Sequence, residues 1–418
     1  MREDLFETLR ERGYIYQCTH EEAVRQAVND GPLTFYLGID PTADSLHIGH
    51  FFALMLFRRL QEAGHRGILL VGGATAMVGD PSGKSDMRQM MDRERVALNI
   101  AEVTALARRF IRTEGDNAAL IVNNADWTDS FSYIEFLRRV GTHFNVSVML
   151  AADAYAKRLA EGGLTFLEMG YMLMQAYDFV HLYENYGCTL QIGGSDQWGN
   201  IVAGVNLGRK MRFGAGGREA ESDVLRGLTC PLLMTRDGKK MGKTEQGTLW
   251  VAREKTAVFD FFQYFYNVDD ADTAMLLKLF TDIETAEAER LCREDAVAAK
   301  RRMAYEITKI VHGAEEADKT VQALQALYGG TGTAADMPTA VLRVPTGQIG
   351  IVELLTESGF LPSRGEARRL IRQGGVSVND GRVQAEDAVI DAAAGTEVVL
   401  KKGKKSFLRV QFEVEVKK

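Results

Sequence analysis

Four short runs of branched and aromatic residues stand out in the first half of the chain. They are LTFYLGI (33–39), GILLVGG (67–73), AALIVNNADW (118–127) and CTLQIGG (188–194), and their length and composition predict β-strands. Between them the apolar positions recur at helical spacing, as in FALMLFRRLQEAG (52–64), which ends on a glycine typical of a helix terminus. Strands that alternate with helices predict parallel strands joined by right-handed crossovers, that is, an α/β sheet.

The pattern changes after about residue 250, where strand-like runs give way to amphipathic helices. These runs are TAVFDFFQYFYNV (256–268), DADTAMLLKLFTDI (270–283), EAERLCRED (287–295) and AVAAKRRMAYEITKIVHG (296–313). YGGTGTAADMPTA (328–340) has little to bury and is typical of a linker. We predict a Rossmann-like α/β domain with a connective insertion (1–246), a helical domain (247–328), a linker (329–349) and an α+β domain of short helices and strands (350–418).

Composition changes this picture little. Hydrophobic residues make up 46% and charged residues 26% of the chain, and the net charge of −7 gives no overall indication of a nucleic-acid partner. No apolar run reaches the roughly 18 residues of a membrane span. The charged start MREDLFETLRERG lacks the apolar core of a signal peptide, so we expect a cytoplasmic protein. The four cysteines lie far apart without metal spacing, and we expect no protein-bound metal.

The stretch GIDPTADSLHIGH (38–50) lies where a predicted strand meets a predicted helix. Gly38 permits close backbone approach to a ligand, and Thr42 suits a helix entry. His47 and His50 are about one helical turn apart and face the same way, beside free N–H groups and a positive dipole that favour phosphate. The pattern predicts a phosphate cradle lined by imidazoles. A plain helix start with two surface histidines, or a metal pair, remains open.

A second stretch, RDGKKMGKTEQGT (236–248), is rich in glycine and lysine. Lys240 and Lys243 on a glycine-rich loop can fold over a triphosphate and neutralise charge during a reaction. The alternative is a solvated basic hairpin.

Polar residues also gather on a predicted helix and beyond the ends of two predicted strands, where ligands of α/β sheets bind. Tyr171, Gln175 and Asp178 share one face of the helix LEMGYMLMQAYDFVHL (167–182), which indicates either a buried ligand or simple packing at a helix edge. Asp196 and Gln197 follow the strand end QIGG and suit a nucleoside. The stretch GGATAMVGDPSGKSDMR (72–88) supplies a further set, namely Asp80 as a candidate for an ammonium group and Lys84 and Arg88 as phosphate helpers or exposed charges.

The C-terminal domain carries a basic helix within SRGEARRLIRQGGVSVNDGRV (363–383). Arg364, Arg368 and Arg372 are four residues apart and form a stripe, with Arg369 beside it, which can lie along phosphates. A solvated helix face is the alternative.

HIGH (47–50) and KMGKT (240–244) together resemble the HIGH and KMSKS signatures of class I aminoacyl-tRNA synthetases, with Gly242 and Thr244 as departures from the second. The whole chain resembles the bacterial tyrosyl-tRNA synthetases, and its last domain resembles the α-L RNA-binding motif. The resemblance implies the following roles: Tyr36 and Asp178 at the phenol hydroxyl of tyrosine; Asp80, Tyr171 and Gln175 at its ammonium group; Gln197 near its carboxylate; Gly38 and Asp40 at the α-phosphate; Gly194 and Asp196 at adenosine and ribose; and Thr42, His47, His50, Lys240, Lys243 and Thr244 at the triphosphate.

The resemblance further implies an enzyme that activates L-tyrosine with ATP, accompanied by Mg²⁺, and transfers it to tRNA(Tyr) as a homodimer. Arg364, Arg368, Arg369 and Arg372 would then contact the tRNA. Three alternatives remain: a tryptophanyl enzyme, a small-molecule adenylate-forming ligase with the same nucleotide cradle, and a non-catalytic RNA-binding paralogue.

Overall fold

The computed structural model describes residues 4–82, 91–213, 224–236, 238–244, 247–329, 339–345, 347–379, 381–403 and 406–413. Lys84 and Arg88 lie outside these ranges. The chain forms two compact units, Met1–Thr256 with Val268–Met303, and Ala257–Asn267 with Ala304–Lys418. The units interleave within the region where we expected a separate helical domain, so the boundary at 246/247 stays a prediction.

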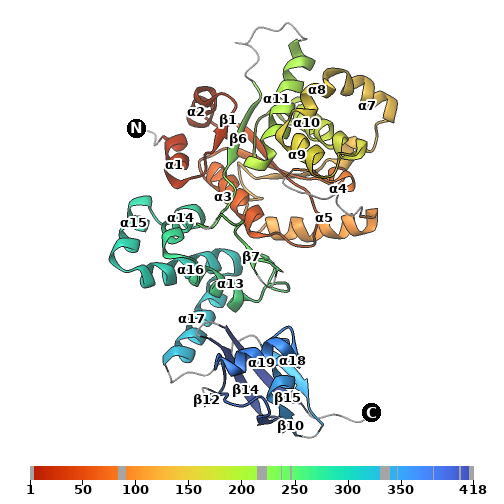
Figure 1. The fold of residues 1–418 in the computed structure, drawn as a ribbon. Coiled ribbons are helices and arrows are strands. Elements are labelled where there is room, and N and C mark those ends of the chain that lie inside the picture. Colours follow the sequence, from red (N-terminus) through yellow and green to blue (C-terminus); the bar gives the residue numbers. More distant parts are fainter. Residues whose placement is uncertain are drawn as a thin grey trace. The chain divides into compact units, whose positions relative to one another are not determined.

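A six-stranded sheet organises the first unit (Figure 1). Its strands are β1 (Gln17–Cys18), β2 (Thr34–Ile39), β3 (Arg66–Val71), β4 (Leu120–Asn123), β5 (Cys188–Gly194) and β6 (Arg226–Cys230), in the order β1-β6-β5-β2-β3-β4. All neighbours are parallel except β1, which runs antiparallel to β6. The predicted α/β parallel sheet is confirmed. The strand order reverses between β2 and β5, which is where such sheets bind ligands.

Alternate side chains of the strands face helices on opposite sides of the sheet. Phe35 of β2 contacts Phe57 of α3 (Ile48–Glu62), with ring centroids 4.8 Å apart. The next residue, Tyr36, lies 5.2 Å from Phe179 of α10 (Phe166–Tyr186), beside which α11 (Trp198–Phe213) packs. Both faces of β2 are therefore buried, as its unbroken apolar run predicts for a central parallel strand.

The first unit contains further helical elements besides α3, α10 and α11. They are α1 (Leu5–Arg12), α2 (Glu21–Asn29), α4 (Thr75–Val78), α5 (Arg93–Ala107), α6 (Ala125–Thr128), α7 (Tyr133–Arg139), α8 (Val146–Leu150), α9 (Asp153–Glu161), α14 (Asp270–Phe280), α15 (Thr285–Glu294) and the single turns η1 (Gly141–His143) and η2 (Ser195–Gln197). The helix expected from Phe52 begins four residues earlier, at Ile48, because His47 caps it. Only 120–123 of the run AALIVNNADW is strand, and α6 follows.

The second unit begins with helices and ends in a mixed sheet. The helices are α13 (Val258–Tyr266), the second half of α16 (Ala296–His312) and α17 (Ala314–Gly329). The C-terminal part holds α18 (Ile351–Glu357), α19 (Arg364–Arg372), β9 (Thr339–Arg343), β10 (Gln348–Gly350), β11 (Val376–Val378), β12 (Gly381–Arg382), β13 (Val389–Asp391), β14 (Glu397–Lys402) and β15 (Ser406–Glu413). Its main sheet has the order β12-β11-β14-β15-β9.

The α+β architecture of the C-terminal part is as expected, but two strands begin inside the segment expected as linker, β10 at its end and β9 well within it. Strand β9 lies inside the segment we expected as linker, and it pairs in parallel with β15. Its burial alternates along TAVLR, which fits an edge strand with one covered face. Within the described ranges, no helix combines the length and apolar composition needed to cross a membrane.

Candidate active site

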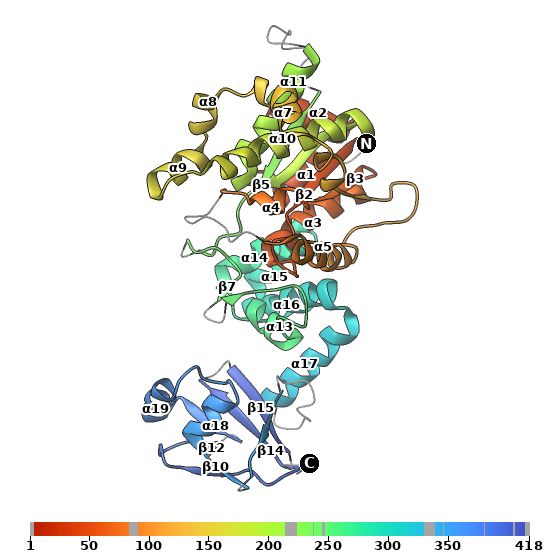
Figure 2. The same ribbon diagram turned by 90° about the vertical axis from the view of Figure 1, so that its right-hand side faces the viewer.

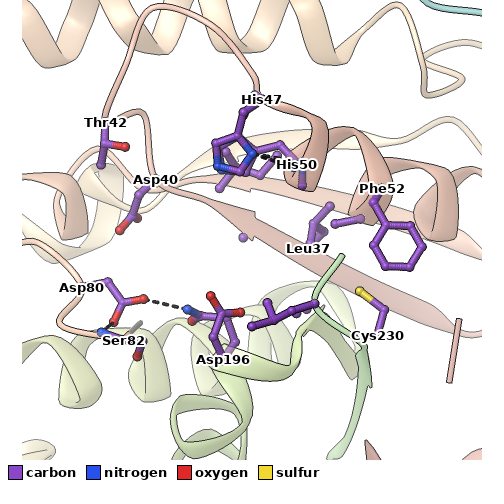
Figure 3. A pocket seen from close by; sticks show the side chains of 18 of the residues that line it. Leu37, Asp40, Thr42, His47, His50, Phe52, Asp80, Ser82, Asp196 and Cys230 are labelled. Atoms are coloured by element: carbon purple, nitrogen blue, oxygen red, sulfur yellow. Dashed lines mark hydrogen bonds between the residues drawn. The ribbon is translucent and has the colours of Figure 1, made fainter. Parts of the chain in front are cut away.

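A cavity of about 470 Å³ opens at the carboxyl ends of β2 and β5, where the strand order reverses. It is lined by predicted site residues from five separate stretches of sequence, namely Tyr36, Gly38, Asp40, Thr42, His47, His50, Asp80, Tyr171, Gln175, Asp178, Gly194, Asp196, Gln197 and Lys240. Figure 3 shows Asp40, Thr42, His47 and His50 on one wall, with Asp80 and Asp196 facing them. The structure therefore brings these residues together, while the role of each stays a prediction.

A buried carboxylate lies at the end of the cavity near Tyr36. Asp178 accepts hydrogen bonds from Trp127 Nε1 at 2.8 Å and Asn124 Nδ2 at 3.0 Å. Burial raises the pKa of Asp178 to about 7, although these two donors oppose the shift, and the nearby Asp40 adds to it. Burial also raises the pKa of Tyr36 well above its ordinary value, and the charge of Asp178 adds to that shift. The Tyr36 hydroxyl is thus a neutral donor.

Three buried polar atoms of the cavity lining find no hydrogen-bond partner among the described residues. They are the hydroxyl of Tyr36, Oε1 of Gln175 and Oε1 of Gln191. Tyr36 and Gln191 are paired directly across β2 and β5. Buried polar groups are nearly always paired, with protein atoms or with ordered water. Their convergence on one cavity indicates that its ligand carries complementary polar groups.

Two further carboxylates are held by side chains from other elements. Asp80 accepts from Gln197 Nε2 at 2.6 Å and from the backbone N–H of Ser82 at 2.9 Å (Figure 3). Asp40 accepts from the hydroxyl of Tyr171 at 2.8 Å and from Thr75 Oγ1 at 2.7 Å. With Asp178, these groups give this part of the cavity a negative potential, which favours a ligand cation such as an ammonium group.

The two histidines form the start of α3. Their rings stack with centroids 3.7 Å apart. His47 Nδ1 accepts from the backbone N–H groups of Gly49 and His50, and His50 Nδ1 accepts from the backbone N–H of His47. The neutral rings then carry their protons on Nε2, the atom able to donate to a phosphate oxygen. The helix start therefore differs from our expectation of free N–H groups, because the His47 ring itself caps two of them.

The segment that carries Lys240, here called the lysine segment (described residues 238–244 and 247–252), lies directly against this helix start. Trp250 forms an antiparallel bridge with His47, and the backbone N–H of Val251 donates to the carbonyl of Leu46 at 2.8 Å. Lys240 lines the cavity, and its charge opposes the rise that burial causes in the pKa of Asp196. Two stretches about 190 residues apart in sequence therefore meet at one cavity. Lys243 and Thr244 form β7, and their side chains lie outside the description.

The glycines expected at the nucleotide also line the cavity. At Gly38 an added Cβ would come no closer than 4.0 Å to Leu70 or Tyr36. Protein atoms therefore do not require glycine there, so any restriction at this position must come from a bound molecule.

The arginines of α19 form an exposed surface in the second unit, but acidic side chains contact them. Glu386 pairs with both Arg368 and Arg372, and Glu366 pairs with Arg369 at 3.9 Å and with Lys402 at 3.5 Å. Ala367 and Ile371 are the buried residues of this helix. Arg364 is exposed as well. The stripe is accessible, and its charge is partly compensated.

Sequence reasoning missed Gln191, whose buried Oε1 lines the cavity, and three residues that hold the carboxylates of the site. Asn124 and Trp127 hold Asp178, and Thr75 joins Asp40 to Asn124, whose Nδ2 lies 3.0 Å from Thr75 Oγ1. Asn124 and Trp127 could have been found from their position, because they directly follow the carboxyl end of β4. Ligands of α/β sheets bind beyond strand ends, and this rule, which selected residues after other strands, would have selected them as well.

Comparisons with known proteins identify the family. A family described as "tRNA synthetases class I (W and Y)" matches residues 28–329, and a "Tyrosine--tRNA ligase SYY-like C-terminal domain" matches residues 331–410. The chain belongs to the class I tRNA synthetases. Within that family it is similar to the tyrosine-tRNA ligases of Acetivibrio thermocellus, at 46% identity over 97% of this chain and 99% of that one, and of Clostridium tetani, at 44% over 99% and 100%.

Solved structures place this synthetase in the same group. A C-terminally truncated mitochondrial tyrosyl-tRNA synthetase from Aspergillus nidulans is 28% identical, with a TM-score of 0.69, and the match covers 78% of this chain and 94% of that one. A tryptophanyl-tRNA synthetase from Encephalitozoon cuniculi shares the fold at 16% identity and a TM-score of 0.53.

Proposed function

We propose that this synthetase activates L-tyrosine with ATP, forming tyrosyl-adenylate and pyrophosphate, and then transfers tyrosine to the 3′-terminal ribose of tRNA(Tyr). Tyrosine-tRNA ligase activity follows from its membership of the tyrosine-tRNA ligase family. The observation that carries the choice of amino acid is the pair of Tyr36 and Asp178 at the buried end of the cavity. An unpartnered hydroxyl beside a carboxylate suits a phenol, which both accepts and donates a hydrogen bond.

The other end of the amino acid would lie among the remaining carboxylates. Its ammonium group would bind at Asp80, with the oxygen atoms of Tyr171 and Gln175 as further acceptors. Gln197, held against Asp80, would orient the carboxylate of the substrate. That carboxylate is itself the nucleophile, so the activation step needs no protein base, and the protein contributes positioning and charge stabilisation.

The phosphates of ATP would lie between the histidines and the lysine segment. In this arrangement His47 and His50 donate from Nε2 and Lys240 supplies positive charge, joined by Thr42, Lys243 and Thr244. These donors stabilise the charge that grows as the bond from the α-phosphorus to pyrophosphate breaks. Asp196 would accept from the ribose hydroxyls, with Gly38, Asp40 and Gly194 against the nucleotide.

Mg²⁺ would arrive with ATP as part of the substrate. The described residues contain no group of three or more His, Cys, Asp or Glu side chains arranged to hold a metal ion. A divalent ion bound by the triphosphate needs few protein ligands.

The tRNA would contact the arginines of α19, whose spacing follows a phosphate backbone. The chain would act as a homodimer through the connective insertion. Helices α7, α8 and α10 are labelled in Figure 2. The large apolar side chains exposed on α7, α8 and the start of α10 are Tyr133 (62%), Ile134 (62%), Val146 (53%), Val148 (70%) and Phe166 (67%). Exposed apolar side chains in this number support an interface. Light scattering would test this, with Val148→Asp expected to yield monomers.

A tryptophan-specific enzyme is the second candidate, because the family includes both specificities. An indole presents one N–H donor and no acceptor, so it would leave the Tyr36 hydroxyl without an acceptor to donate to.

Pyrophosphate exchange without tRNA separates these functions. The assay would compare tyrosine, tryptophan and phenylalanine as the sole amino acid. We expect exchange with tyrosine at rates far above those with the other two. Exchange with tryptophan alone would overturn the choice of substrate, and no exchange with any amino acid would overturn the activity.

A further inference from the structure

The lysine segment contacts α3 through Gly242, a residue without a side chain. Gly242 has φ +84°, and a Cβ added there would lie 2.4 Å from Cγ2 of Ile48, the first residue of α3. The next nearest atoms are Cβ of Ile48 at 3.6 Å and Cβ of Leu249 at 3.8 Å. The methyl group of Ile48 therefore fills the space that a side chain at 242 would need.

Neither partner can move aside without cost. Ile48 is 2% exposed, and its β-branched side chain is stiff at the start of a helix that the His47 ring caps. Backbone hydrogen bonds hold the described residues on both sides of Gly242: Met241 N–H donates to the carbonyl of Leu233, Leu249 N–H to that of Gly242 and Val251 N–H to that of Leu46. An ion pair between Lys255 and Asp44 adds a side-chain tie at 2.6 Å.

We propose that Gly242 is a positioning residue for nucleotide activation: its missing side chain lets the lysine segment rest on Ile48, and this contact holds Lys240 at the cavity beside His47 and His50. The inference rests on the proposed function. It adds Gly242 as a residue that acts on the reaction through Lys240. It also gives a physical reason for glycine where the related signature has serine. Serine would meet the same methyl group and would carry the strain of a left-handed φ.

The size of the effect follows from the contact distance. Restoring an ordinary separation of 3.4 Å from 2.4 Å moves the segment by about 1 Å, and a displacement of that size costs about 10²-fold in rate when it misplaces a charged donor. Tyrosine binds to other walls of the cavity, so its affinity should hold.

Gly238 provides a matched control in the same segment. Its φ is +75°, close to that of Gly242, but an added Cβ would meet nothing within 4 Å. Gly238→Ala therefore introduces the same backbone strain without the contact.

The test is a double-mutant cycle of Gly242→Ala with Ile48→Ala, alongside Gly238→Ala. Pyrophosphate exchange gives kcat and KM for ATP, equilibrium dialysis with labelled ATP gives its affinity directly, and tryptophan fluorescence gives tyrosine affinity. We expect Gly242→Ala to lower kcat/KM for ATP about 10²-fold with tyrosine affinity changed less than about twofold. Gly238→Ala should lose less than about tenfold, and the loss from Gly242→Ala should shrink to that level in the Ile48→Ala background.

Each other outcome overturns the inference. Equal losses from Gly242→Ala in both backgrounds would exclude the contact with Ile48. Equal losses from Gly242→Ala and Gly238→Ala would assign the effect to strain, and loss of tyrosine binding would assign it to general damage. A wild-type protein that binds ATP but shows no tyrosine-dependent exchange would overturn the proposed function instead, and dialysis would still report whether Gly242→Ala weakens ATP binding.

Discussion

Replacing Tyr36 by phenylalanine should stabilise the free protein while weakening substrate binding. Tyr36 is 1% exposed, and its hydroxyl meets no hydrogen-bond partner in the part of the chain that the structure describes. A buried hydroxyl left unpaired costs about 1–3 kcal/mol. Removing it should therefore raise the free energy of unfolding by about 1 kcal/mol, which in a unit of this size raises the melting temperature by about 2 °C.

The same hydroxyl would form a hydrogen bond with the phenol of tyrosine. A neutral hydrogen bond contributes about 0.5–1.5 kcal/mol net, so Tyr36→Phe should weaken tyrosine binding by a factor of about 2–13. Phenylalanine as a substrate has no phenol hydroxyl to pair with Tyr36, so Tyr36→Phe should leave its binding unchanged or improve it. Discrimination between the two amino acids should fall by about the same factor.

Calorimetry of the free protein and pyrophosphate exchange with both amino acids would measure the two effects. The opposite signs are the test, because a merely damaged site would lose both stability and binding. A lower melting temperature for Tyr36→Phe, or an unchanged preference for tyrosine over phenylalanine, would refute the reasoning.

Three further predictions concern charge. Burial raises the pKa of Asp178 to about 7, so the stability that its protonated form contributes is complete below about pH 4 and is lost as the pH rises to 7. In urea unfolding, the free energy of unfolding of Asp178→Asn should therefore rise by about 3 kcal/mol relative to that of wild type between pH 5 and pH 8. A difference between the two proteins that does not change with pH would contradict this. Lys243→Ala should slow tyrosyl-adenylate formation about 10²-fold with tyrosine affinity unchanged, measured by stopped flow. Glu386→Gln removes the partner of Arg368 and Arg372, so tRNA should bind about threefold more tightly in filter binding, with a steeper salt dependence; weaker binding would show that Glu386 orients them.

Four strands of the central sheet, β2 to β5, could be predicted from the sequence because their side chains are mostly buried or half-buried, whereas β6 was not predicted. Their apolar runs are continuous, and β2, β3 and β5 lie within two residues of the predicted limits. The two-residue edge strand β1 is too short to leave a pattern. Strand β9 was missed for a different reason: its partner β15 lies more than 60 residues away in sequence, and local patterning carries no information about such a pairing.

The site followed from one rule and one resemblance. Polar residues at strand ends led to Asp80, Asp196 and Gln197, all of which line the cavity. Asn124 and Trp127 were missed because they bind a protein carboxylate, which a search for ligand groups does not consider. The stacking of the two histidine rings depends on rotamers and capping, which spacing alone does not determine.

The position of β15 has a consequence for biosynthesis. Strand β15 lies between β14 and β9, so the C-terminal sheet cannot close until residues 406–413 have left the ribosome. Until then two strand edges stay open, and a product terminated early by a nonsense codon would keep both open permanently. We expect proteases to recognise such fragments, which makes closure of this sheet a check that β15 has been synthesised.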